Sequence, residues 1–234
     1  MRVHLVVVLT GCLLSTWQTA AAQKDSVPHP AHRLAWVAPL GIAASAVLDP
    51  EAREWALHGH TRSLDRLANS VNKLGTTQRL VPAMAITYLG ALVTHHESVA
   101  VGTLNTAAGY LAADLVESAL KPMVGRERPH VSGNSHRFHP FTANGDWHSF
   151  PSAHVAHVAS IAAAISAQTQ STPVSALSDV LVALVGLDRV YEDQHWTSDV
   201  AATIILSSVV SWATVRWLRS RTTTSATAAS PAPR

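Results

Sequence analysis

The stretch DRVYEDQHWTSD, residues 188–199, lies between two long apolar runs and holds an arginine, a histidine and an aspartate at fixed spacing. His195 and Asp199 are four residues apart, so on a helix, or across a helix start, their side chains face one another. A carboxylate beside an imidazole can orient the ring for nucleophilic or base chemistry. Arg189, six residues before the histidine, supplies a planar, permanently charged fork suited to phosphate or carboxylate.

The apolar runs on both sides of this stretch and before it predict the fold. Alanine and leucine dominate most of them, which favours helix over strand, and no segment alternates with a period of two. A further amphipathic helix is expected over residues 51–74. The sequence predicts an all-α fold, a helical bundle of about six core helices. The six apolar runs cover residues 35–48, 80–93, 99–120, 154–168, 174–190 and 200–218.

The chain of 234 residues suits one domain with flanking segments. Residues 1–22 have a basic start, an apolar run and then small residues, which predicts a secretory signal peptide cleaved near Ala22. A lipoprotein signal ending at Cys12 is the rival interpretation, and the apolar run before that cysteine is very short. We expect residues 23–33 to be flexible, residues 34–221 to form the domain, and residues 222–234 to be disordered, because Thr, Ser, Ala and Pro cannot build a core.

Composition excludes several classes of function. A net charge of +2 with only 14% charged residues is too weak for a nucleic-acid surface, so no nucleic-acid partner is expected. Cys12 is the only cysteine, so a chain cleaved after Ala22 has neither a disulfide nor a catalytic thiolate. The 14 histidines could signal a metal, but they are scattered and follow no repeated ligand spacing, and no cofactor is expected. The sequence does not determine an oligomeric state.

Two more segments carry candidate site residues. In KPMVGRERP, residues 121–129, Lys121 and Arg128 bracket a turn after an apolar run; alone, such cations usually complement a helix dipole. In PSAH, residues 151–154, Ser152 fits a helix N-cap, and the first-turn N–H groups, including that of Ala153, form a ready anion site beside His154. Alone, this segment is an ordinary serine cap with an incidental histidine.

The stretch 188–199 also has simpler interpretations. Arg189 could form a surface ion pair, Thr197 or Ser198 could cap a helix, and His195 with Asp199 could bind a metal if other ligands existed. The three segments together, in this order and at helix ends, indicate a phosphate pocket. The polar stretch 126–150 lies between two of them and is expected to be a long structureless loop that acts as a lid or a substrate-entry loop.

The three segments resemble the pattern Lys-x6-Arg-Pro, Pro-Ser-Gly-His and Ser-Arg-x5-His-x3-Asp of the type 2 phosphatidic acid phosphatase (PAP2) superfamily, which includes bacterial acid phosphatases and vanadium-dependent haloperoxidases. The resemblance covers most of the helical domain, and it implies a PAP2/haloperoxidase-like bundle. It also implies a phosphatase that acts through a phosphohistidine without a metal.

The resemblance implies a role for each matching residue. His195 is expected to be the nucleophile, Asp199 its orienting partner, and His154 the general acid that protonates the leaving group and later activates water. The phosphate-binding residues are expected to be Lys121, Arg128, Ser152, Ala153 and Arg189.

Two positions depart from the family pattern. Ala153 replaces a glycine, and a methyl group is tolerable there because the first helical residue has a negative φ. Asp188 replaces a serine and places a carboxylate next to an anion site. We predict that Asp188 turns away from the phosphate and holds Arg189 by a salt bridge.

The same family contains membrane lipid phosphatases and soluble acid phosphatases. Six apolar runs favour a membrane protein, but several are shorter than the roughly 20 residues of a span. If the signal is cleaved and all six runs span, the cluster Arg216, Arg219 and Arg221 lies outside, against the positive-inside rule. The conflict disappears if residues 35–48 do not span, if the N-terminal segment stays as an anchor, or if the protein is soluble. We expect an exported, membrane-associated protein with its site on the outer, periplasm-like face, and a soluble periplasmic protein as the alternative.

The leading hypothesis is a phosphomonoesterase that acts on lipid or isoprenoid phosphates. The alternatives are a soluble non-specific acid phosphatase and a haloperoxidase that holds vanadate in the same cradle. A catalytically silent helical envelope protein is the alternative of another class, and a metallohydrolase is a further one.

Overall fold

The computed structural model describes residues 31–169 and 171–228. The predicted signal peptide and nearly all of the predicted flexible segment 23–33 lie outside these residues. The described part contains no β-strand, and its one isolated bridge pairs Arg126 with Phe138. The predicted all-α fold is therefore confirmed. The helices are α2 (Ala31–Val47), α3 (Asp49–His58), α4 (Arg62–Asn72), η1 (Lys73–Gly75), α5 (Thr77–Val93), α6 (Glu97–Val124), α7 (Pro129–Ser132), η2 (Gly145–Trp147), α8 (Ala153–Gln168), α9 (Thr172–Tyr191) and α10 (Thr197–Ala228).

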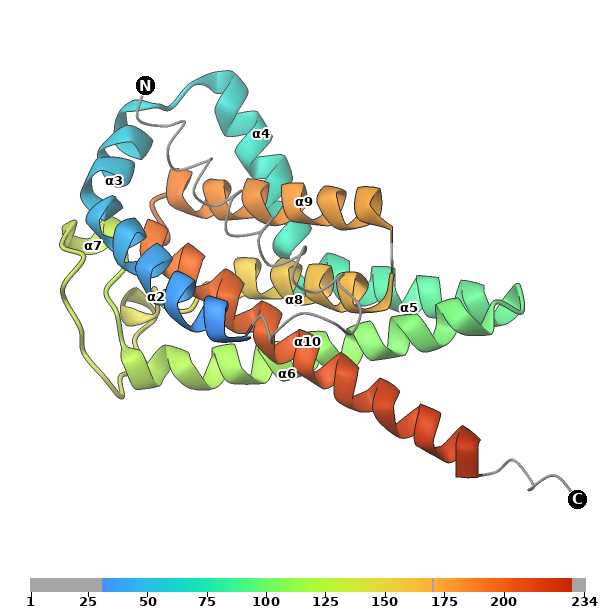
Figure 1. The fold of residues 1–234 in the computed structure, drawn as a ribbon. Helices are drawn as coiled ribbons and strands as arrows, with labels where there is room; N and C mark the ends of the chain where they lie inside the picture. The colour runs from blue at the N-terminus through green and yellow to red at the C-terminus, as the bar shows by residue number, and fades with distance from the viewer. Residues whose placement is uncertain (1–30, 170, 229–234) are drawn as a thin grey trace, which may run out of the picture.

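Helix α8 lies at the centre of the bundle and packs against α6, α9 and α10 (Figure 1). Alanine, valine and serine dominate its buried face, and their small side chains let neighbouring helices approach closely. Helix α5 packs along α6, α2 packs against α10, and α3 and α4 pack against α9. The six predicted apolar runs correspond to α2, α5, α6, α8, α9 and α10.

The helix predicted over residues 51–74 is wrong as a single element. The chain forms α3 and α4 instead, with η1 after them, and Gly59 ends α3. Thr61 then starts α4, because its side chain accepts a hydrogen bond from the backbone N–H of Leu64 at 3.3 Å. The glycine ends one helix and the threonine begins the next, so the chain changes direction between them even though the apolar spacing continues from α3 to α4.

The sequence predicted a structureless loop over residues 126–150, and this prediction is wrong. The segment contains α7 and η2, and four of its polar residues are buried: Arg126, Glu127, Ser135 and Ser149. Gly125 starts the segment with φ of 59°, and an added Cβ would lie 1.9 Å from the carbonyl oxygen of His139. Glycine is required there because the turn combines a left-handed backbone with close chain contact.

Helix α10 extends beyond the rest of the bundle (Figure 1). It runs to Ala228, seven residues into the segment predicted to be disordered. An existing helix continues easily, because each added residue gains a backbone hydrogen bond without a new nucleation step.

Candidate active site

Four helix ends meet at one end of the bundle. Helices α6 and α9 end there, whereas α8 and α10 begin there, on the left of Figure 1 beside α3 and α7. The first turns of α8 and α10 bring the positive ends of two helix dipoles together, and the first turn of α8 has no side-chain cap. This end of the bundle therefore suits an anion, and it holds all the site residues predicted from the sequence.

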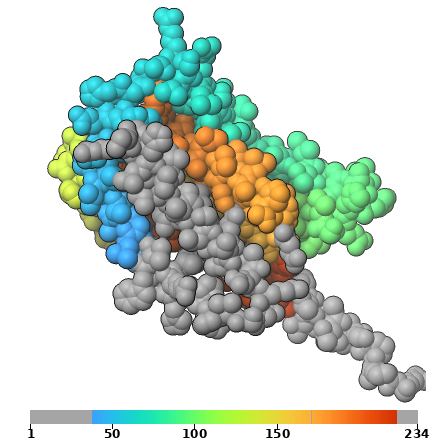
Figure 2. All heavy atoms as spheres, turned by 45° about the horizontal axis from the view of Figure 1, so that its top comes forward, coloured from blue at the N-terminus to red at the C-terminus, as the bar shows by residue number. Residues whose placement is uncertain are grey.

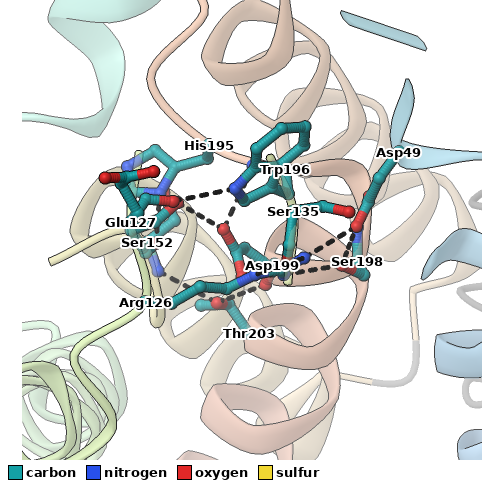
Figure 3. A network of polar contacts seen from close by, with 11 residues as sticks. Asp49, Arg126, Glu127, Ser135, Ser152, His195, Trp196, Ser198, Asp199 and Thr203 are labelled. Atoms are coloured by element: carbon teal, nitrogen blue, oxygen red, sulfur yellow. Dashed lines mark hydrogen bonds and ion pairs between the residues drawn. The ribbon is translucent and has the colours of Figure 1, made fainter. Parts of the chain in front are cut away.

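Asp199 lies in the first turn of α10 and is the centre of a buried polar network (Figure 3). Its side chain is 1% exposed. One oxygen accepts a hydrogen bond from Arg126 Nη1 at 2.6 Å. The other accepts from Ser149 Oγ at 2.5 Å and from the backbone N–H of Trp196 at 3.1 Å. Three hydrogen bonds of this kind, one of them from a cation, keep a carboxylate in place at full burial.

Arg126 joins this network to α3. Its Nη2 donates to Asp49 Oδ2 at 2.8 Å, and its Nη1 donates to Ser198 Oγ at 2.8 Å. Asp49 also accepts from the backbone N–H of Ser198 at 2.8 Å, so a carboxylate from another helix caps the start of α10. The guanidinium thus bridges two carboxylates and fixes the first turn of α10 against α3.

His195 lies between α9 and α10 and is 4% exposed. Its ring Nδ1 is 2.5 Å from the backbone carbonyl oxygen of Ser149, so that nitrogen carries the proton and Nε2 is left with a lone pair. Burial lowers the pKa of His195 well below its usual range, and the charges of Arg128 and Lys121 lower it further. A neutral imidazole with a free Nε2 is the form that a nucleophile requires.

Asp199, which the family resemblance implied to be the orienting partner of His195, is linked to that ring through Ser149. Within the described residues, the Asp199 carboxylate makes no hydrogen bond to the His195 ring. Ser149 stands between them, with its hydroxyl on Asp199 and its carbonyl on His195. Spacing alone could not show this, because the turn before α10 directs the ring toward the segment that precedes α8.

His154 lies in the first turn of α8 and is partly exposed. Burial lowers the pKa of His154 to about 4, and the charges of Arg189, Lys121 and Arg128 contribute to this shift. The same three cations lower the pKa of His195, so both histidines lie in one positive field. These five residues are brought together from α6, the segment after it, α8, α9 and the α9–α10 connection.

Ser152 is the N-cap residue of α8, as the sequence predicted, but its hydroxyl caps nothing. The Oγ atom is buried without a hydrogen-bond partner, while the backbone N–H of Ser152 donates to Thr203 Oγ1 at 3.0 Å. Ala153 follows as the first residue of α8. A buried hydroxyl with no partner is costly unless a ligand supplies one, so this end of α8 favours a bound anion.

The three cations are held in different ways. Lys121 forms an ion pair with Glu117 on its own helix α6. Arg128 donates to the carbonyl oxygen of Gly145 at 3.0 Å and to Gln194 Oε1 at 2.6 Å. Lys121 has an acidic partner, whereas Arg128 bonds only to neutral oxygen atoms. A bound phosphate would therefore neutralise the charge of Arg128.

Asp188 holds Arg189, as predicted. Arg189 donates from Nε at 2.9 Å and from Nη2 at 2.5 Å to one oxygen of Asp188, and both side chains are buried. The other carboxylate oxygen is buried without a partner, and burial raises the pKa of Asp188 although Arg189 opposes that shift. Asp188 therefore orients the Arg189 guanidinium, and its carboxylate offsets part of the positive charge that Arg189 brings to the site.

Arg126, Asp49 and Ser149 were not identified from the sequence. Arg126 lies two residues before Arg128, and nothing in its spacing tells a buried bridging cation from an exposed one. Asp49 stands before Pro50 at a helix start, a pattern that predicts a local cap and not a contact with α10. The described residues contain no group of three histidine, cysteine or acidic side chains placed to hold a metal ion.

The fold and the site define a class. An all-α bundle whose helix ends gather three cations, two histidines and an uncapped helix N-terminus is a site for a phosphoryl group. Residues 102–223, more than half of the chain, match the PAP2 superfamily. The chain belongs to the PAP2 superfamily, and it is a phosphatase.

One solved structure shares the fold. It is the crystal structure of the first transmembrane PAP2 type phosphatidylglycerolphosphate phosphatase from Bacillus subtilis, with a TM-score of 0.60 and 19% sequence identity. The similarity covers 79% of this chain and 94% of that one. No curated protein matches the sequence.

Proposed function

We propose that the protein is a metal-independent phosphomonoesterase that acts on lipid or isoprenoid phosphates through a phosphohistidine. The observation that carries this proposal is the buried His195, whose Nδ1 is held by a backbone carbonyl within the field of three cations. Lys121, Arg128 and Arg189 supply the charge that neutralises the phosphate oxygens. The Ser152 hydroxyl and the Ala153 N–H are placed to donate to the same oxygens.

The reaction has two steps. In the first, Nε2 of His195 forms a bond to phosphorus while the bond to the ester oxygen breaks, and His154 gives a proton to the departing alkoxide. In the second, His154 takes a proton from water, which attacks phosphorus and breaks the phosphorus–nitrogen bond. Ser149 and Asp199 keep the His195 ring in the required tautomer throughout.

Substrate binding prepares His154 for its role. In the free enzyme, the pKa of about 4 keeps this ring neutral at neutral pH, because burial and the cations disfavour a further positive charge. A phosphate dianion offsets the cations when it binds, so it raises the proton affinity of His154. The general acid therefore acquires its proton in the complex with substrate.

The exposed surface supports a lipid substrate and membrane association. Ile86 on α5, Leu115 on α6 and Leu177 on α9 are 71%, 71% and 63% exposed, whereas Ser160 and Ser211 are fully buried. Figure 2 shows α5 and its turn into α6, in green, projecting from the bundle. Apolar side chains outside and small polar ones inside suit a bilayer better than water.

Among the described residues, two helices are long and apolar enough to cross a membrane, namely α6 and Thr197–Arg221 within α10. Arg216 and Arg221 lie toward the C-terminal end of α10, far from the site. The Cζ atom of Arg216 is 4.9 Å from the centroid of the Trp212 ring, and that of Arg221 is 4.6 Å from the centroid of the Trp217 ring. Arginines and tryptophans at one helix end are typical of a cytoplasmic membrane interface. This arrangement supports a site on the opposite, outer face. The similar structure from Bacillus subtilis is that of a transmembrane lipid phosphate phosphatase, which agrees with this substrate class.

Phosphate release tests the proposal. Wild type and His195→Ala are compared, in detergent, on a lipid phosphate, an isoprenoid phosphate and a soluble alkyl phosphate. We expect the wild type to prefer the first two and His195→Ala to lose more than about 10³-fold. Acid quenching during turnover should trap an acid-labile phosphoenzyme in the wild type only. Equal phosphate release by His195→Ala would refute the proposal, and bromide oxidation with added vanadate in place of hydrolysis would favour the haloperoxidase.

A further inference from the structure

His157 lies on α8, close to one turn after His154, and is buried against α6 and η1. Its Nδ1 is 2.9 Å from the backbone carbonyl oxygen of Gly75, and its Nε2 is 2.9 Å from Asp114 Oδ1. The ring also stacks on Tyr110 with the centroids 5.0 Å apart. Both neighbours are oxygen atoms that accept hydrogen bonds, so the ring is held from its two nitrogen atoms by two different elements. The result is a charge-assisted hydrogen bond that ties η1 to α6 through α8.

Gly75 in turn contacts His154. A Cβ atom added to Gly75 would lie 2.8 Å from Cβ, 2.9 Å from Cδ2 and 3.1 Å from Cα of His154. Within the described residues, no group hydrogen-bonds to the ring of His154. Packing against the backbone of Gly75 is therefore what limits the position of that ring on this side.

The proposed mechanism assigns no task to Gly75, His157 or Asp114, yet each contact leads to the next. Asp114 holds His157, His157 holds the carbonyl of Gly75, and Gly75 lies against His154. A general acid works only when its proton lies within hydrogen-bond distance of the leaving oxygen. We propose that Asp114, His157 and Gly75 form a positioning unit that holds His154 against the leaving-group oxygen.

This inference rests on the general-acid role proposed for His154. Within the described residues, none of the three hydrogen-bonds to His195 or to the cations proposed to bind phosphate, so they are positioning residues and not catalytic ones. Their loss should harm the step that needs a proton, and it should spare a substrate whose leaving group departs without one.

Gly75→Ala is the sharpest perturbation. Carbon atoms in contact prefer about 3.5–4.0 Å, so the new methyl group must displace His154 by roughly 0.7–1.2 Å from its 2.8 Å contact. Gly75 does not have a positive φ, so alanine brings no separate backbone strain there. Gly90→Ala on α5 is the matched control, because a Cβ at Gly90 meets no atom within 4 Å.

The measurement is kcat/KM for a soluble alkyl phosphate and for p-nitrophenyl phosphate, in the full-length protein. This ratio covers only the steps up to release of the leaving group, so water activation does not enter it. For Gly75→Ala we expect a loss of about 10²-fold on the alkyl phosphate, as for a group misplaced by about 1 Å, and less than about threefold on the aryl phosphate. Gly90→Ala should match the wild type on both.

Asp114→Asn gives a second, milder test if Gly75→Ala does not fold. The Asp114 side chain is 37% exposed, and asparagine keeps its shape without the charge. We expect a loss of about tenfold on the alkyl phosphate and little change on the aryl phosphate, which is less than the full general-acid contribution of about 10²–10⁴-fold because the His154 ring is loosened and not removed. Equal losses on both substrates, or no loss on the alkyl phosphate, would overturn the inference. Activity retained by His195→Ala would instead refute the proposed function, so the two failures are distinguishable.

Discussion

Replacing Arg126 by glutamine tests the buried network beneath the site. The Arg126 guanidinium lies between the carboxylates of Asp49 and Asp199, at 2.8 and 2.6 Å, and both acidic side chains are 1% exposed. Glutamine cannot reach both acids and carries no charge. Arg126→Gln therefore leaves two carboxylates close together without the cation that compensates them.

The expected magnitude follows from burial. Removing one partner of a buried ion pair costs about 3–5 kcal/mol, because the remaining charge stays desolvated. We expect Arg126→Gln to lower the free energy of unfolding by about 4 kcal/mol, a large part of a typical total of 5–15 kcal/mol. Asp49→Asn alone should cost about 3 kcal/mol through its lost charge-assisted hydrogen bonds. In the Arg126→Gln background it should cost less than about 1 kcal/mol, since it removes one uncompensated charge.

The assay is urea unfolding in detergent micelles, followed by tryptophan fluorescence. Trp196 reports on the site, since Arg126 Cζ lies 5.5 Å from its ring. Arg137→Gln is the comparison: its own side chain is 48% exposed, and its partner Glu127, which is 2% exposed, keeps a hydrogen bond from Ser132, so we expect a clearly smaller loss than for Arg126→Gln. A cost below about 1 kcal/mol for Arg126→Gln, or strict additivity with Asp49→Asn, would refute the reasoning.

Three further predictions concern activity. The productive complex needs one proton shared between His154, whose pKa is about 4, and a phosphate ester, whose second pKa is about 6. The value of kcat/KM should therefore peak between about pH 4 and pH 6 and fall about tenfold per pH unit above about pH 6. A profile that stays flat to about pH 8 would contradict this. Ser149→Ala keeps the carbonyl that holds His195 but loses the link to Asp199, so kcat should fall about tenfold with KM little changed in steady-state assays; an unchanged kcat would show that the link is dispensable. Asp188→Ser removes a buried carboxylate beside the phosphate site, so kcat/KM should stay the same or rise, whereas a collapse of activity in Asp188→Asn would indicate a catalytic role.

The sequence alone determined the fold class and pointed to the candidate site residues. Runs rich in alanine and leucine specify helices because propensity and periodicity act locally. The motif residues His154, Arg189 and His195 could be identified because their order and helix-end positions are readable from spacing. The salt bridge from Asp188 to Arg189 was predictable as well, since the two residues are neighbours in the chain.

Only the tertiary structure decided which groups support that site. Arg126 is buried between acids from α3 and α10, Ser149 separates Asp199 from His195, and Gly75 lies against His154. Each of these contacts joins elements far apart in the chain, and hydrophobic spacing carries no information on how a turn aims a polar side chain. Local sequence sets which helices form and which charges stand at their ends, whereas the packing of those helices sets the partner that each buried charge must find.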